Sequence, residues 1–162
     1  MKYLNYLTFI LMVGFAPGVV GCTYVSVEKT RAFNPDVQPL LKQLHMQYGA
    51  LALRKQSEGN PDSAYHFNAK ALQAAEGLAV KADQPDDADS LDAYRRLSAG
   101  MKDDIRPVDP AVKARAQVMF DCWLDERAQG VDKDDIIACK QEFERALLVI
   151  AGASASSGEA VQ

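Results

Sequence analysis

Basic residues are too few and too scattered in this chain to recruit a polyanion. The 162 residues include 18 lysines and arginines against 22 aspartates and glutamates, so the net charge is −4, and both signs are interspersed. Nothing forms the basic stripe that binds a phosphate backbone. We therefore expect no nucleic acid among the partners of this protein.

Strand-forming patterns are equally scarce. After residue 30 the sequence has no long alternating segment of valine, isoleucine and threonine, and aromatic residues make up only 8% of the chain. Alanine, leucine, glutamine and charged residues are abundant instead, and these favour helices. The length suits one domain of ordinary size. We expect an all-α fold.

Motifs that carry catalysis are absent. The sequence has no nucleophile elbow, phosphate-binding loop or dinucleotide-binding fingerprint. The acidic clusters "DDADSLD" and "DKDD" lack the alternating ligands and central glycine of a calcium loop. His45 and His66 fall on the first two expected helices and could approach each other, but two partly exposed helical histidines are the favoured interpretation. We expect no catalytic residue, no metal and no cofactor, and therefore no enzyme.

The N-terminus lacks the uninterrupted run of about 20 apolar residues that a membrane-spanning helix needs. Gly14, Pro17 and Gly18 interrupt the apolar segment "LTFILMVGFAPGVVG", which follows a single lysine. A positively charged start, a short apolar core and small residues before a cleavage site are typical of a secretory signal peptide. We expect residues 1–21 to be such a peptide.

A lone cysteine, Cys22, stands at the end of this segment. The three residues before it, Val-Val-Gly at positions 19–21, resemble the bacterial lipobox. The cysteine thiol is the nucleophile suited to forming a thioether with diacylglycerol, and two or more acyl chains such as palmitate anchor a protein stably. An ordinary signal peptide, an uncleaved anchor and a buried thiol are the alternatives. Since Thr23 stands where an inner-membrane retention signal would have aspartate, we expect an anchor in the outer membrane, facing the periplasm, rather than in the inner membrane.

Behind Cys22 the sequence divides into three parts. Residues 22–34 are expected to be a tether, with a short extended piece at "TYVSVE". Residues 35–151 are expected to form a helical-hairpin domain of about five helices, loosely tetratricopeptide-like in outline although no consensus repeat is legible. Residues 152–162, small and polar, are expected to be a disordered tail. The helix starts are predicted from cap residues and first-turn prolines: Asp36 with Pro39, Asn60 with Pro61, Asp109 with Pro110, and Asp132.

The other two cysteines, Cys122 and Cys139, lie about eight residues on either side of the turn at Gly130 and Val131. In an antiparallel hairpin both therefore sit at about the same height. In an oxidising periplasm we expect them to form a disulfide, worth about 3 kcal/mol. Buried free thiols are the main alternative. A redox pair would take the form C-x-x-C, and a zinc site would need further ligands.

Two segments carry a family resemblance. Phe-Asp-Cys-Trp at 120–123 and Cys-Lys-x-x-Phe at 139–143, with the alanine-rich helix before them, resemble the helical N-terminal region of alphaproteobacterial OmpA-family outer-membrane lipoproteins. The resemblance implies an outer-membrane location and a helical module. The sequence ends in a Ser/Ala-rich tail where that family continues into a peptidoglycan-binding domain, so peptidoglycan binding is not carried over.

The expected function is therefore that of a lipoprotein anchored in the membrane by its lipid. Its periplasm-facing helical module would bind envelope proteins, whose identity the sequence does not give, or serve a structural role. The alternative is a small-molecule or lipid carrier with an apolar cavity between its helices.

Overall fold

A computed structural model describes residues 26–102, 108–130 and 132–155 of the chain, and the regular structure in these ranges is entirely helical. The all-α prediction is confirmed. Residues 1–25, which include Cys22 and the expected signal peptide, lie outside the described residues. None of the helices in the described ranges is long and apolar enough to cross a membrane. The helices are α1 (Val27–Ala32), α2 (Pro39–Ser57), α3 (Pro61–Ala75), α4 (Ala88–Gly100), α5 (Pro110–Gln129) and α6 (Lys133–Ala155).

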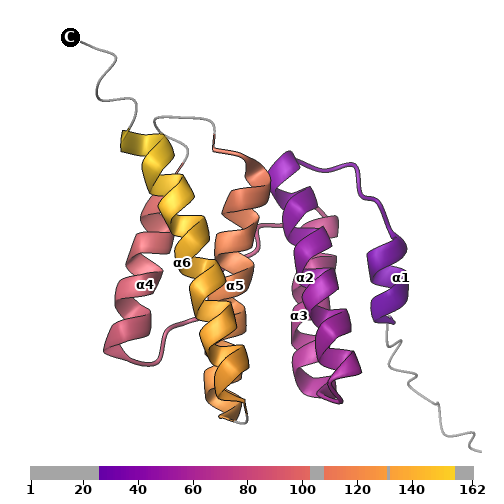
Figure 1. The fold of residues 1–162 in the computed structure, drawn as a ribbon. Helices are drawn as coiled ribbons and strands as arrows, with labels where there is room; N and C mark the ends of the chain where they lie inside the picture. The colour runs from indigo at the N-terminus through magenta and orange to yellow at the C-terminus, as the bar shows by residue number, and fades with distance from the viewer. Residues whose placement is uncertain (1–25, 103–107, 131, 156–162) are drawn as a thin grey trace, which may run out of the picture.

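The helices form two antiparallel hairpins, α2 with α3 and α5 with α6 (Figure 1). The hairpins meet where α5 packs against α2, while α4 covers α5 and α6 from one side and α1 covers α2 and α3 from the other. Figure 1 shows α5 set back between α2 and α6. This arrangement leaves α2 and α6 as the two flanks of one face.

Three of the four predicted helix starts are confirmed. Asn60 caps α3 before Pro61, and Asp109 caps α5 before Pro110. The carboxylate of Asp132 accepts a hydrogen bond from the backbone of the first turn of α6. Gly130, with φ of 64°, takes the left-handed conformation that ends α5 and that L side chains rarely adopt.

The start of α2 differs from the prediction. Its N-cap is Gln38 rather than Asp36, and no side chain caps it; Pro39 does lie in the first turn, as expected. The fixed φ of Pro39 favours a helix that begins at Pro39 itself. A cap at Asp36 would instead start the helix two residues earlier. Helix α3 stops at Ala75, and the next residues turn through Gly77 at φ 77°.

Two segments outside the predicted domain are helical. The expectation of an extended piece is wrong for Val27 and Glu28, which open α1. Ser26 caps this helix by accepting a hydrogen bond from the backbone of Lys29, and α1 is held by burial of Val27 and Thr30 against α2 and α3. At the other end, α6 continues to Ala155, four residues beyond the predicted domain end at 151.

The core centres on α5, which is buried on almost every side. Phe120 and Trp123 of α5 pack with Phe143 of α6, with ring centroids 5.4–6.2 Å apart. Aromatic residues of this size dominate the apolar area that a small helical domain buries. Because α5 is fixed so firmly, the side chains on its few open positions have well-defined surroundings.

Candidate binding groove

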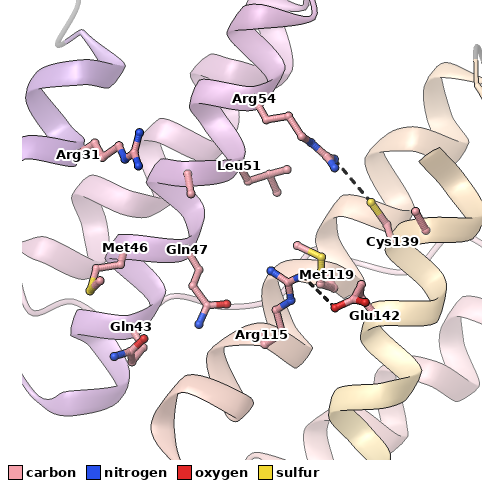
Figure 2. Close-up of a pocket in the computed structure, with 12 residues that line it drawn as sticks. Arg31, Gln43, Met46, Gln47, Leu51, Arg54, Arg115, Met119, Cys139 and Glu142 are labelled. Carbon is pink, nitrogen blue, oxygen red and sulfur yellow. Dashed lines mark hydrogen bonds and ion pairs between the residues drawn. The ribbon is translucent and has the colours of Figure 1, made fainter.

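The open face between α2 and α6 carries a groove whose floor is α5 (Figure 2). Two adjoining hollows form it, of about 480 and 360 Å³, which share Gln47, Arg115 and Glu142. One wall is a stripe of α2 at three- and four-residue spacing, and the other is a matching stripe of α6. The α2 stripe consists of Gln43, Met46, Gln47, Ala50, Leu51 and Arg54; the α6 stripe consists of Ala138, Cys139, Glu142, Arg145, Ala146 and Val149.

The charged residues of this groove are almost all of one kind. Arg31, Arg54, Arg115 and Arg145 line it, and Glu142 is the one carboxylate among its lining residues. The groove therefore carries a formal charge of +3, four minus one, on a chain whose net charge is −4. We call it the arginine groove.

Three of these arginines keep donors available at the surface. Arg115 and Arg145 both pair with Glu142, and their side chains are 46% and 67% exposed. Arg31 of α1 is exposed, and its side chain has no hydrogen-bond or ion-pair partner within the described residues. The hydrogen bond from Arg115, helped by Arg145, holds the pKa of Glu142 below its usual range. Glu142 therefore stays ionised, and it offsets only one of the two arginines that share it.

Arg54 closes one end of the arginine groove. In Figure 2 it reaches from α2 toward Cys139 on α6. Its Nη2 lies 3.0 Å from Cys122 Sγ and 3.2 Å from Glu126 Oε1. Glu126 also accepts a hydrogen bond of 2.5 Å from the buried Lys55. Since acidic partners surround Arg54, its charge is largely matched, and the unmatched positive charge lies at Arg31, Arg115 and Arg145.

The floor and walls between the arginines are mostly apolar. Met46 is 52% exposed and Val149 is 55% exposed, while Met119 of α5 lies on the floor. Methionine adapts to irregular surfaces and is frequent at binding sites for varied partners. On the α2 wall Gln47 donates to the carbonyl of Ala111, whereas its Oε1 is buried and accepts no hydrogen bond.

The predicted disulfide borders this groove. Cys122 and Cys139 are bonded at 2.12 Å, with their Cα atoms 5.8 Å apart, so the predicted disulfide between α5 and α6 is confirmed. With Glu126 the two sulfurs form the cluster of the described chain that comes nearest to a metal site. Arg54 and Lys55 place their positive charges on that cluster. These two cations repel a metal ion, and they already occupy the lone pairs of Glu126 and the sulfurs that a metal would need.

A second polar cluster lies on the opposite face of α5, and it is buried. Asp121 is 0% exposed and accepts hydrogen bonds from Tyr48 of α2 and Lys70 of α3, both 2.5 Å, and from the backbone of Asp83, 2.8 Å. Lys70 also pairs with Asp83 at 2.7 Å. The cluster thus ties α2, α3, α5 and the α3–α4 connection together.

The ionisation of this cluster is set mainly by burial. Burial raises the pKa of Asp121 to about 6, although Lys70 opposes the shift. Burial also raises the pKa of Tyr48, further helped by Asp121. Burial alone would raise the pKa of Asp83. The hydrogen bonds from His66 and Lys70 outweigh burial, so the pKa of Asp83 lies below its ordinary value. Every polar atom named here has a partner inside the protein, so the cluster offers nothing to a ligand.

The two histidines do not meet. His45 is buried rather than partly exposed, and its ring nitrogens lie 3.0 Å from the carbonyl oxygen of Ala71 and 2.8 Å from that of Phe33. His66 is exposed as predicted, and the carboxylate of Asp83, 2.9 Å from its Nε2, orients its ring. That hydrogen bond, against an opposing effect of burial, raises the pKa of His66.

The residues of the two resemblance segments are structural in this fold. Asp121 anchors the buried cluster, and the ring of Trp123 lies under the cations of Arg127 and Lys140, whose distances to its centroid are 5.3 and 4.5 Å. Lys140 then pairs with Asp89 of α4. No protein-family model, no curated protein and no solved structure matches the chain. The resemblance to OmpA-family lipoproteins therefore stays a prediction.

Proposed function

We propose that this protein is a membrane-anchored lipoprotein of the cell envelope whose helical domain binds another protein in the arginine groove. The observation that carries the proposal is the groove itself, an open trough between two helical hairpins with four arginines and one carboxylate along an apolar floor. Clefts between packed helices are common binding sites, and a few placed polar groups in an apolar lining give them specificity.

The charges of the groove support binding rather than folding. A surface ion pair such as Arg115 with Glu142 adds about 0–1 kcal/mol to stability. The side chain of Arg31 has no hydrogen-bond or ion-pair partner within the described residues, so ion pairing gives no structural reason for its position beside the groove. Arginine is also enriched at the centres of protein interfaces, where its planar guanidinium makes several hydrogen bonds at once.

The membrane anchor is the part of the proposal that rests on sequence alone, on Cys22 and the lipobox-like residues before it. Replacing Cys22 with serine removes the thiol to which diacylglycerol would be attached. We expect Cys22→Ser to move the protein from the membrane fraction to the soluble fraction once the signal peptide is removed. A processed Cys22→Ser protein that stays in membranes would reject the lipoprotein assignment while leaving the groove untouched.

The binding function is tested by site-specific photo-crosslinking in living cells. A photoreactive amino acid at Ala50, on the groove wall, is compared with one at Ala69, which is also exposed and lies on α3 of the same hairpin. We expect Ala50 to capture a defined envelope protein, identified by mass spectrometry and confirmed by the reciprocal crosslink from that partner, and Ala69 not to capture it. Equal capture from both positions, or from neither, would reject the groove as the binding site.

One observation favours the carrier as a second candidate. A hollow of about 630 Å³ between the ends of α4 and α6 is lined by Ala99, Leu147 and Ile150 among others, beside the Arg96–Glu144 ion pair. Its size lies within the range of small-ligand sites, roughly 300–1,000 Å³. Native mass spectrometry of the purified protein would show a bound apolar molecule if the carrier role is correct, and the apoprotein mass alone if it is not.

A further inference from the structure

The arginine groove has the shape of a site into which one more helix could pack. Its walls, α2 and α6, both pack against α5 but not broadly against each other. A helix lying on α5 between them would complete a four-helix arrangement, in which neighbouring axes lie about 8–10 Å apart. The lining stripes run from residue 43 to 54 on α2 and from 138 to 149 on α6. Each stripe therefore spans twelve residues of helix, about 18 Å or three turns.

The charges of the groove decide the chemistry of its occupant. The positive residues lie on both sides of the apolar floor, with Arg31 beside the α2 wall and Arg145 on the α6 wall. Arg115 extends from α5 between them (Figure 2). All are arginines, whose forked donors bind carboxylates with two parallel hydrogen bonds. An occupant that matches both walls has an apolar stripe with carboxylates along both of its edges.

We propose that the arginine groove binds an acidic amphipathic helix of about three turns in a partner protein. This inference rests on the proposed function, since it specifies the partner of that same site. Apolar residues of the helix, at spacings of three and four, lie on Met119 and the small residues of the walls, including Ala50 and Ala138. Glutamates or aspartates beside that stripe pair with Arg31, Arg115 and Arg145.

The negative charge of the whole molecule directs an acidic helix to the groove rather than to other parts of the surface. The chain is acidic, with a net charge of −4, so an acidic partner is repelled from most of its surface and is attracted to the groove. Complementary charge of this kind raises the rate of association and suppresses wrong partners, and its effect weakens as salt is added. A basic or neutral helix would gain nothing from the groove arginines and would bind elsewhere on the surface.

The test is a selection from a displayed peptide library. Each peptide has about 14 residues, with leucines fixed at positions i, i+3, i+7 and i+10 of a helix, and its flanking positions are varied equally among glutamate, glutamine and lysine. The purified full-length wild type is compared with the double variant Arg31→Glu/Arg145→Glu. Arg95→Glu/Lys133→Glu is the matched control, because it makes the same change in net charge at two exposed residues outside the groove.

We expect the wild type and the control to enrich glutamate over lysine at the flanking positions, and the groove variant to lose that preference or reverse it. A synthetic copy of the enriched peptide, followed by fluorescence anisotropy, should bind the groove variant at least about tenfold more weakly than the control. Its affinity for the wild type should fall as salt is raised.

The possible failures separate the two proposals. Enrichment of lysine-rich or glutamine-rich peptides that still crosslink to Ala50 would overturn the acidic helix and leave the interaction module standing. No enrichment from any of the three proteins, together with no capture from Ala50 in cells, would overturn both. A concentration-dependent dimer that the groove variant abolishes would assign the groove to a second copy of this chain and overturn the helix proposal.

Discussion

Charged side chains are buried and fully hydrogen-bonded on one face of α5 and are exposed to solvent on the other. On one face Asp121 is fully buried and accepts three hydrogen bonds from groups of the protein itself. On the other face Arg115 is half exposed and shares its partner Glu142 with Arg145. Both faces hold charge on the same helix, yet only one of them leaves donors facing solvent. The buried face ties elements together, and the open face has the properties of a recognition surface.

Under the proposed function, this difference separates the residues that stabilise the fold from those that bind a partner. A buried ion pair is costly to break because the partner that remains stays desolvated without compensation. An exposed pair contributes little to stability, and its donors can turn to a ligand without unfolding anything. Substitutions on the two faces of α5 should therefore have opposite consequences, and the following predictions run from the largest expected effect to the smallest.

Replacing Asp121 with alanine should have the largest effect on stability. It leaves Tyr48 and Lys70 buried with fewer partners, and we expect the free energy of unfolding to fall by about 3–5 kcal/mol. Urea denaturation followed by circular dichroism measures this. Asp92→Ala, at an exposed aspartate of α4, is the control and should change stability by less than about 1 kcal/mol. Equal effects of the two substitutions would contradict the structural role of Asp121.

Removing the disulfide should come next. In Cys122→Ala/Cys139→Ala the bond between α5 and α6 is lost, and the unfolded chain regains the freedom of the loop that spans a separation of 17 residues. We expect a loss of about 3 kcal/mol in unfolding free energy, and a similar loss when the wild type is reduced. Labelling of either cysteine by a thiol reagent under denaturing, non-reducing conditions would show that the bond is absent.

The pH dependence of stability should reveal the buried carboxyl. The pKa of Asp121 is about 6 in the fold against about 3.9 in an unfolded chain. Between these two values the folded state holds a proton that the unfolded state has released, so the contribution of Asp121 to stability falls as pH rises from about 4 to about 6. The stability of the wild type relative to Asp121→Asn should therefore decrease by up to about 3 kcal/mol over that window.

His66 has to be kept apart from Asp121 in this experiment. Its pKa is raised in the fold, so its contribution is fully present below its unfolded pKa of about 6.5 and is lost as pH rises through the folded pKa. Because Asp83 joins the two groups, the comparison is repeated in a His66→Gln background. A stability difference between wild type and Asp121→Asn that stays constant from pH 4 to pH 7, or that grows with pH, would contradict the account.

Reversing charges in the arginine groove should change stability least. The side chain of Arg31 has no hydrogen-bond or ion-pair partner within the described residues, and Arg145 is 67% exposed. We expect Arg31→Glu/Arg145→Glu to alter the free energy of unfolding by less than about 1 kcal/mol, which urea denaturation would show. A larger loss would mean that these arginines stabilise the fold, and the contrast between the two faces would then disappear.

Local signals in the sequence predicted most of the architecture. Proline in the first turn and an Asn or Asp cap mark the starts of α3 and α5, and Gly130 marks the end of α5, because each acts through the backbone of its own segment. Helix α1 was missed because its six residues show too little periodicity, and packing of Val27 against α2 and α3 stabilises it. The extension of α6 to Ala155 was missed because small residues carry no apolar stripe.

The disulfide and the groove differ in how far the sequence could predict them. Cys122 and Cys139 lie on two consecutive helices, so their heights follow from counting residues to the turn. The groove draws Arg31, Arg54, Arg115 and Arg145 from four different helices, and only the packing of α2 against α5 brings them together. The contact between His66 and Asp83 also depends on the tertiary fold, since Asp83 lies in the α3–α4 connection, which folds back over α3.

The central claim, that the arginine groove binds a partner while the opposite face of α5 holds the fold, is tested most directly in living cells. The measurement is the yield of the photo-crosslink from Ala50 in Arg31→Glu/Arg145→Glu, relative to that in Arg95→Glu/Lys133→Glu. The account predicts a fall of about tenfold or more, at equal protein abundance. An unchanged yield in the groove variant would contradict it.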